Sequence, residues 1–74
     1  MNEPIIRLFT DDITRIAGGR QWTFCPKRLA PKPGERVRLI DVMTRHPPLT
    51  RTVGNVIADQ PGIAQDWCFV EFTS

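Results

Sequence analysis

The chain has 74 residues, which suffices for a single domain over residues 1–74 and leaves no room for a separate cofactor domain. Its hydrophobic fraction of 41% and charged fraction of 24% are ordinary for a globular domain. No apolar run approaches the roughly 20 residues of a membrane-spanning helix, and the first residues lack the regions of a signal peptide. We therefore expect a cytoplasmic protein without membrane contact.

The net charge of +2 conceals an uneven distribution along the chain. Residues 15–51 carry a net charge of +7, whereas residues 1–14 carry −2 and residues 52–74 carry −3. A basic middle segment suits a polyanionic partner such as nucleic acid. The alternative is that folding places the acidic residues of the flanks beside the arginines of the middle, which leaves an ordinary solvated surface.

The N-terminal part predicts a strand followed by a short helix. Residues 4–9 are apolar and bounded by a proline and a polar run, as is typical of a strand. Thr10 or Asp11 can cap a helix. Asp11 and Asp12 would then lie in its first turn, where the helix dipole favours negative charge.

The predicted helix is short, barely two turns. Ile13, Ile16 and Ala17 fall at helical spacing, so they are expected on its buried face. Gly18 and Gly19 end the helix, because glycine adopts the left-handed conformation freely.

A second strand is predicted over residues 21–24, followed by a basic loop over residues 25–34. Three prolines exclude regular structure from that loop. The turn KPGE at 32–35 leads into a strand over 36–41. In this strand apolar and basic residues alternate, which indicates a half-buried strand with a basic face.

The C-terminal part predicts two further strands. Residues 43–50 form a loop because Pro47-Pro48 cannot continue a strand or a helix. A strand is expected over 52–58, where Gly54 indicates a bulge or a close approach of two backbones. After a turn-rich loop, a strand over 67–72 fits the interior of a sheet. One of its faces carries Trp67, Phe69 and Glu71 and the other carries Cys68, Val70 and Phe72.

These elements indicate an α+β fold that is mainly β. Four to five short strands, one short N-terminal helix and frequent turn signals favour a small β-barrel or curled sheet.

The few soft metal ligands argue against a metal site. Cys25, Cys68 and His46 are the only cysteines and the only histidine, and they lack the spacing of a zinc site. A disulfide is disfavoured in a reducing compartment, so we expect two half-buried thiols. No metal or cofactor is therefore expected.

The order and spacing of several short motifs over residues 12–58 resemble the ASCH family, a branch of the PUA-like β-barrels. The segment IAGGRQWTF precedes a basic loop and then PKPGERVRLID, and VRLIDVMTRH looks like the family's strand and Met-containing loop. The family pattern has a helix ending in Gly, a Lys three residues before a Thr, and a Pro-Gly-Asp/Glu turn. The matching residues are Gly18, Thr23, Pro33, Gly34 and Glu35.

The resemblance implies RNA binding, ribonuclease activity or hydrolysis of an amide on a modified nucleoside, as in different ASCH-like proteins. Two departures bear on catalysis. Arg20 stands where the family has its lysine, and Cys25 stands where it has an arginine. An arginine stays protonated and cannot activate the Thr23 hydroxyl as a base, so Arg20 and Thr23 form a weak catalytic pair. His46 suits a general base by type but has no identifiable partner.

The leading hypothesis is a small nucleic-acid-binding module, with RNA favoured over DNA, that uses a basic cleft without catalysis. Phosphate contacts would make binding depend steeply on salt. Trp22 could stack on an unpaired base, core packing being its alternative role and the expected role of Phe24. The candidate ligand-contacting residues are Arg20, Trp22, Thr23, Lys27, Arg28, Lys32, Arg36, Arg38 and Arg45.

Two alternatives stay open. In the first, the chain binds a host or phage protein through its sheet edges and proline loops, as a small phage-encoded inhibitor would. In the second, it is an amidohydrolase acting on a modified nucleoside such as N4-acetylcytidine.

Overall fold

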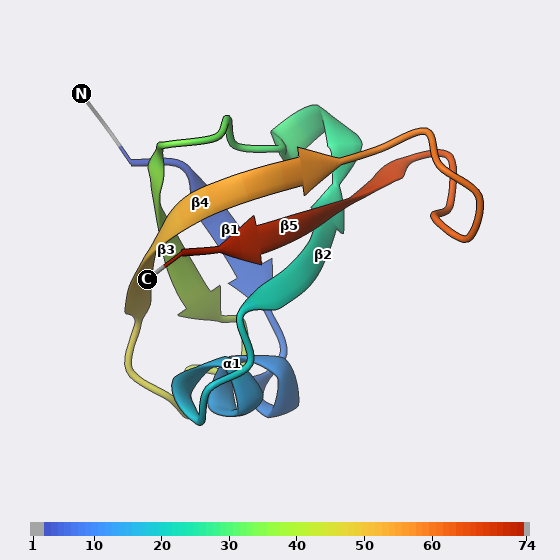
Figure 1. Cartoon of the computed structure of the whole chain (residues 1–74). Coiled ribbons are helices and arrows are strands. Elements are labelled where there is room, and N and C mark those ends of the chain that lie inside the picture. Colours follow the sequence, from blue (N-terminus) through green and yellow to red (C-terminus); the bar gives the residue numbers. More distant parts are fainter. Residues whose placement is uncertain (1–2, 74) are drawn as a thin grey trace.

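The computed structural model describes residues 3–73. In it, five strands and one α-helix make up the fold (Figure 1). The α+β, mainly β prediction is confirmed. Within residues 3–73, every helix is too short or too polar to cross a membrane. The elements in chain order are β1 (Ile5–Leu8), α1 (Thr10–Ala17), β2 (Trp22–Pro26), the 3₁₀ turn η1 (Lys27–Leu29), β3 (Arg36–Asp41), β4 (Leu49–Ile57) and β5 (Trp67–Phe72).

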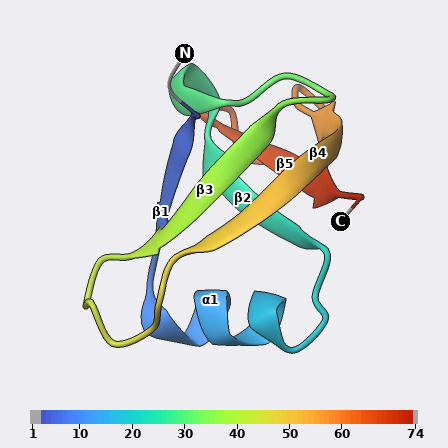
Figure 2. The same cartoon turned by 90° about the vertical axis from the view of Figure 1, so that its left-hand side faces the viewer.

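All five strands form one mixed sheet in the order β1-β3-β4-β5-β2. β1 runs parallel to β3, and the other neighbouring strands are antiparallel. The sheet curls so that its two edge strands, β1 and β2, approach each other, but no hydrogen-bonded ladder of the described residues joins them (Figure 2). The fold is therefore a curled sheet with an open seam, not a closed barrel.

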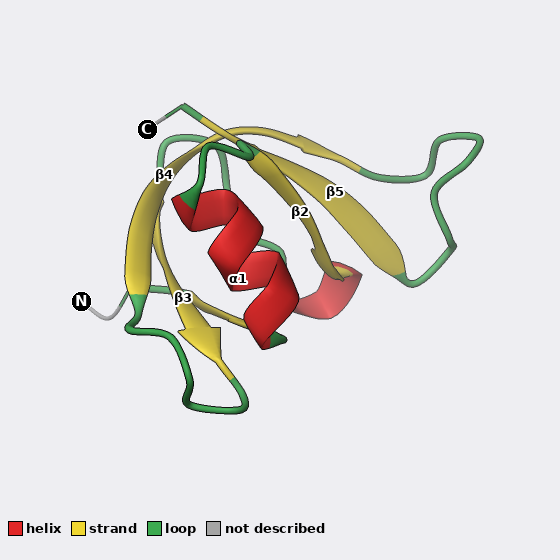
Figure 3. Ribbon diagram, turned by 90° about the horizontal axis from the view of Figure 1, so that it is seen from below, coloured by secondary structure: helices red, strands yellow, loops and turns green. Residues whose placement is uncertain are grey.

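The core fills the inside of this curl. Residues alternate between the buried inner face and the exposed outer face along β1, β2, β3 and β5, as the two-residue period of a strand requires. The helix α1 lies across one open end and buries Ile13 and Ile16 (Figure 3). The other buried apolar side chains are Ile6, Leu8, Cys25, Val37, Leu39, Val53, Cys68, Val70 and Phe72.

The start of α1 differs from the prediction in its cap. Phe9, not Thr10 or Asp11, is the N-cap residue, and no side chain caps the helix. The Thr10 hydroxyl instead donates a hydrogen bond to Asp41 at 2.8 Å, which ties the helix to the end of β3. Asp11 and Asp12 do lie in the first turn, as predicted.

α1 ends at the predicted glycines, but only one of them has the left-handed conformation. Gly18 is the C-cap residue with φ −84°, so the left-handed conformation falls only on Gly19, with φ +122°. Ala17, the last residue of α1, is exposed instead of buried.

Two strands extend further than predicted. β2 includes Cys25 and Pro26, which stand opposite Cys68 and Trp67. Proline is tolerated there because β2 is an edge strand and needs no ladder hydrogen bond on its outer side. β4 begins at Leu49, directly after the two prolines, because Leu49 pairs with Leu39 of β3.

The predicted turn and bulge are both present. The Glu35 N–H donates to the Lys32 carbonyl at 3.1 Å, and Gly34 supplies the positive φ of +89° that closes the turn. The register between β4 and β5 shifts between Val53 and Val56, which confirms the irregularity expected at Gly54.

Cys25 and Cys68 are fully buried free thiols, not half-buried ones. They are directly opposite each other in β2 and β5, and their Sγ atoms are 3.5 Å apart. Burial raises the pKa of Cys25 well above its ordinary value, and the neighbouring Cys68 raises it further. Both thiols therefore pack as small apolar side chains.

Candidate ligand cleft

A cleft of about 350 Å³ lies at the open seam, where β1 and β2 fail to pair. We call it the seam cleft. It exists because the two edge strands approach without closing the sheet, so side chains from both strands face a shared gap. It is lined by Arg7, Leu8, Phe9, Asp12, Arg20, Trp22, Thr23, Phe24, Pro26 and Trp67.

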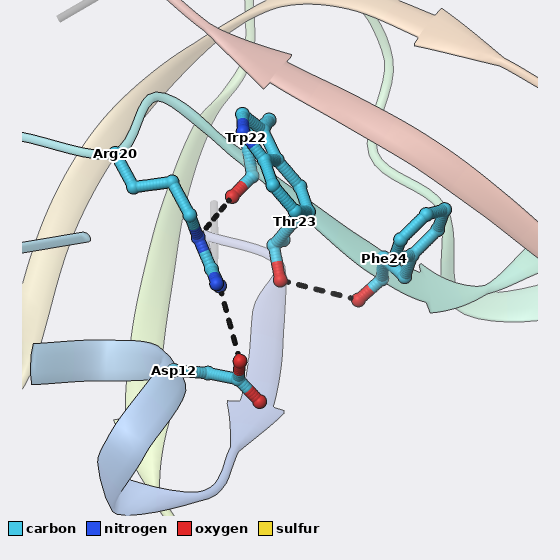
Figure 4. A network of polar contacts seen from close by, with 5 residues as sticks. All are labelled: Asp12, Arg20, Trp22, Thr23 and Phe24. Carbon is cyan, nitrogen blue, oxygen red and sulfur yellow. Dashed lines mark hydrogen bonds and ion pairs between the residues drawn. The ribbon is translucent and has the colours of Figure 1, made fainter. Parts of the chain in front are cut away.

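Arg20 lies in the wall of the seam cleft and is held by three contacts (Figure 4). Its Nε–H donates to the Trp22 carbonyl at 3.1 Å, and its Nη2 donates to Asp12 Oδ1 at 3.2 Å. Its guanidinium carbon also lies 4.5 Å from the centre of the Trp22 ring, within the range of a cation–π interaction. The side chain is only 16% exposed, so Arg20 is an ordered cation.

Thr23 lies in the same cleft but is 3% exposed. Its hydroxyl donates to the Phe24 carbonyl at 3.4 Å, away from any base (Figure 4). The donors of Arg20 go to Trp22 and Asp12. The structure thus brings the two residues to one cleft without the hydrogen bond that a nucleophile and its base require.

The outer face of β2 and β5 carries a cluster of aromatic side chains. Trp22, Phe24 and Phe69 have ring centres 5.5–5.8 Å apart. The prediction that Phe24 packs in the core is wrong, because Phe24 pairs with Phe69 on the outer face and is 44% exposed. Thr23 and Cys25 take the inner positions of β2 instead.

Trp67 stands outside this ring cluster and is 44% exposed. It is opposite Pro26 in the ladder between β2 and β5. It also borders a second hollow of about 590 Å³, which adjoins the seam cleft at Pro26 and Trp67 and is further lined by Lys27, Arg28 and Asp66. Trp67 is thus an aromatic surface that both hollows share.

The nine predicted ligand-contacting residues do not gather in one cleft. Arg20, Trp22 and Thr23 line the seam cleft, and Lys27 and Arg28 line the adjoining hollow. The remaining four lie elsewhere. Lys32 is in the turn before β3, Arg36 and Arg38 are on the outer face of β3, and Arg45 lines a separate hollow with His46.

Three ion pairs join the basic middle segment to the acidic flanks. Within residues 3–73 these are Arg20–Asp12 at 3.2 Å, Arg36–Glu3 at 3.5 Å and Lys27–Asp59 at 2.5 Å. The interleaving that the sequence left open as an alternative therefore occurs for three of the predicted cations. Charge segregation along the chain is a weaker argument for a polyanion partner than the sequence indicated.

The sequence prediction missed five polar or aromatic residues of the seam cleft, namely Arg7, Phe9, Asp12, Phe24 and Trp67. Arg7 was assigned to the acidic flank, although alternation with buried Ile6 and Leu8 points it outward. For Trp67 the signal was Glu71, because a charged residue on the same face of β5 marks that face as the outer one.

No three His, Cys, Asp or Glu side chains in the described part of the chain gather closely enough to hold a metal ion.

In the comparisons with known proteins, no family model, no curated protein and no solved structure gives a significant match to the chain.

Proposed function

We propose that the chain binds single-stranded nucleic acid in the seam cleft, without catalysis. The observation that supports this most directly is the cleft itself. It combines the exposed rings of Trp22, Phe24 and Trp67 with the guanidinium groups of Arg7 and Arg20. Aromatic rings beside cations are what an unpaired nucleotide needs, since its base stacks and its phosphate is neutralised.

A single strand fits this chemistry better than a duplex. The bases of a duplex are stacked on one another, so they cannot stack on protein side chains without being unpaired first. Among residues 3–73, Arg7 makes no ion pair, so its charge is free for a phosphate. Arg28 likewise makes none and lies in the adjoining hollow.

The resemblance to ASCH proteins is the reason to favour RNA over DNA. In this proposal Arg20, at the position of the family lysine, binds an anion. Thr23 lines the cleft as a buried side chain. The preference for RNA is part of the proposal, and a DNA strand of the same sequence tests it.

The test is a titration with a short fluorescein-labelled oligouridylate, followed by fluorescence anisotropy at about 20 mM and about 200 mM salt. We expect binding that weakens as salt rises. Trp67→Ala should weaken binding at least about fivefold, because a stacked base contributes roughly 1–3 kcal/mol.

Met43→Ala is the matched control, since Met43 is 49% exposed and lies outside the seam cleft. It should bind like the unsubstituted protein, and circular dichroism should show both variants folded. An absence of binding at low salt, or equal losses in the two variants, would contradict the proposal. A DNA strand of the same sequence tests the preference for RNA.

A protein partner is the second candidate, because apolar side chains concentrate along the seam. Six of the eight large hydrophobic residues exposed within residues 3–73 line the seam cleft or the small cavity that continues it between β1 and β2. They are Ile5, Phe9, Trp22, Phe24, Leu29 and Trp67. The unpaired edges of β1 and β2 also offer backbone groups to an added strand.

A pull-down from bacterial lysate, with and without nuclease, separates the two candidates. A host or phage protein that stays bound after nuclease treatment, and is lost with Trp67→Ala, would favour the protein-binding role. Hydrolysis of N4-acetylcytidine is the third hypothesis, and the contacts of Arg20 and Thr23 lend it no support. Turnover of this nucleoside by the unsubstituted chain would establish it.

A further inference from the structure

Arg20 has two contacts that do not involve Asp12. Its Nε–H bonds the Trp22 carbonyl at 3.1 Å, and its guanidinium lies over the Trp22 ring (Figure 4). Both contacts come from β2, two residues along the chain. The guanidinium is therefore already oriented in the cleft wall, and its Nη groups point toward the cleft side of α1.

The contact from Arg20 to Asp12 has the features of an exchangeable one. Its length of 3.2 Å exceeds the roughly 2.7–2.9 Å of a strong charge-assisted hydrogen bond. The Asp12 side chain is 46% exposed, so it can return to water at little cost. Asp12 makes this one side-chain contact, whereas Arg20 makes two others, to the Trp22 carbonyl and the Trp22 ring.

We propose that Asp12 occupies the place of a ligand phosphate on Arg20, and that a phosphate of the bound strand displaces it. A carboxylate oxygen and a phosphate oxygen accept the same N–H donors, so the exchange leaves Arg20 in place. The inference rests on the proposed function. It names Asp12 as an intramolecular competitor that lowers the affinity of the seam cleft for nucleic acid.

Asp11 provides a matched control for this competition. Asp11 and Asp12 are adjacent in the first turn of α1, and replacing either by Asn removes one negative charge. Only Asp12 lines the seam cleft and contacts Arg20. The two substitutions also weaken the interaction with the helix dipole by similar amounts, and Asp12→Asn loses in addition the ion pair with Arg20.

The experiment compares Asp12→Asn with Asp11→Asn in the oligouridylate titration at low salt. We expect Asp12→Asn to bind about two- to fivefold more tightly than Asp11→Asn, the range that an exposed ion pair allows. In a second comparison, Asp12→Asn is made in an Arg20→Gln background. In that background Asp12→Asn should no longer increase the affinity for oligouridylate, because there is no Arg20 guanidinium for Asp12 to occupy.

The outcomes separate this inference from the proposed function. If the unsubstituted chain binds and the two Asn variants gain equally, the competition is overturned and nucleic-acid binding stands. If the gain persists without Arg20, the competition is likewise overturned. If the unsubstituted chain does not bind at low salt, the proposed function falls, and the competition that rests on it falls too. If an Asn variant does not fold, Asp12→Ser and Asp11→Ser replace the pair.

Discussion

Asp41 shows how one residue can organise an entire loop. It is the last residue of β3 and is 2% exposed. Its carboxylate accepts hydrogen bonds from the Thr10 hydroxyl and from the backbone N–H groups of Met43, Arg45 and His46, all at 2.8–3.0 Å. Burial alone acts to raise the pKa of Asp41, but these four donors outweigh it and leave that pKa below the ordinary 3.8.

A prediction about Asp41 follows from this lowered pKa. Asp41→Asn should lower the melting temperature near neutral pH, because the amide nitrogen meets N–H donors and cannot accept from them. The carboxylate stabilises the fold at every pH above its unfolded pKa, and the effect is lost as pH falls through the lower folded pKa. The difference between the two proteins should therefore shrink at about pH 3.

Thermal unfolding followed by circular dichroism at the two pH values measures this difference. Asp66→Asn serves as the control, since Asp66 is exposed in the loop before β5. An equal loss of melting temperature at both pH values would show that the hydrogen bonds of Asp41 do not depend on its charge.

At the scale of elements, the bulge in β4 shifts the pairing register between β4 and β5. Gly54 lies in the irregular stretch, and a Cβ placed on it would be 2.7 Å from the Thr73 Cγ2 atom. The Thr73 N–H donates to the Thr52 carbonyl at 2.9 Å, so the chain after β5 is fastened to β4 at this point. Position 54 needs glycine because the Thr73 side chain leaves no space for a Cβ atom, and not because the backbone has a positive φ.

Gly54→Ala should therefore destabilise the protein by about 1 kcal/mol, because the Thr73 methyl group must move. In a Thr73→Ser background the contacting methyl group is absent. There the same substitution should be neutral or stabilising by up to about 1 kcal/mol, since alanine restricts the unfolded chain. Urea denaturation of the four proteins measures both effects. Equal costs in the two backgrounds would rule out the methyl contact as the cause.

At the scale of the whole molecule, the curl of the sheet decides which charges can act together. Arg7 and Arg45 are both exposed, yet Arg7 lines the seam cleft and Arg45 lines a hollow with no lining residue in common. In a chain with a net charge of +2, general attraction to a polyanion would treat the two alike.

Arg7→Gln and Arg45→Gln change the net charge equally. Comparing them therefore distinguishes binding in the seam cleft from nonspecific electrostatic attraction of the oligonucleotide to the whole protein. Arg7→Gln should weaken oligouridylate binding. It should also make the slope of log affinity against log salt shallower by about 0.7, the value for one phosphate contact on a single strand. Arg45→Gln should leave both quantities unchanged. Similar losses in both variants would move the binding away from the seam cleft.

The sequence alone determined the order and approximate bounds of the elements, because these depend on local signals. Alternation of apolar and basic residues indicated β3, and an apolar run broken by Glu71 alone indicated β5. Glycine and proline marked the end of α1, the turn before β3 and the bulge in β4. Arg20, Trp22 and Thr23 line one cleft, as expected for residues that are neighbours in the chain.

Only the tertiary structure decided which faces and partners these residues have. The pairing of β2 with β5 places Thr23 and Cys25 on the inner face and Trp22 and Phe24 on the outer face. The hydrophobicity of the two large aromatic side chains would have predicted the opposite. The approach of β1 to β2 adds Arg7 to the cleft, and the packing of α1 adds Asp12. These are contacts between segments far apart in the chain, which depend on how the sheet curls and which no local pattern encodes.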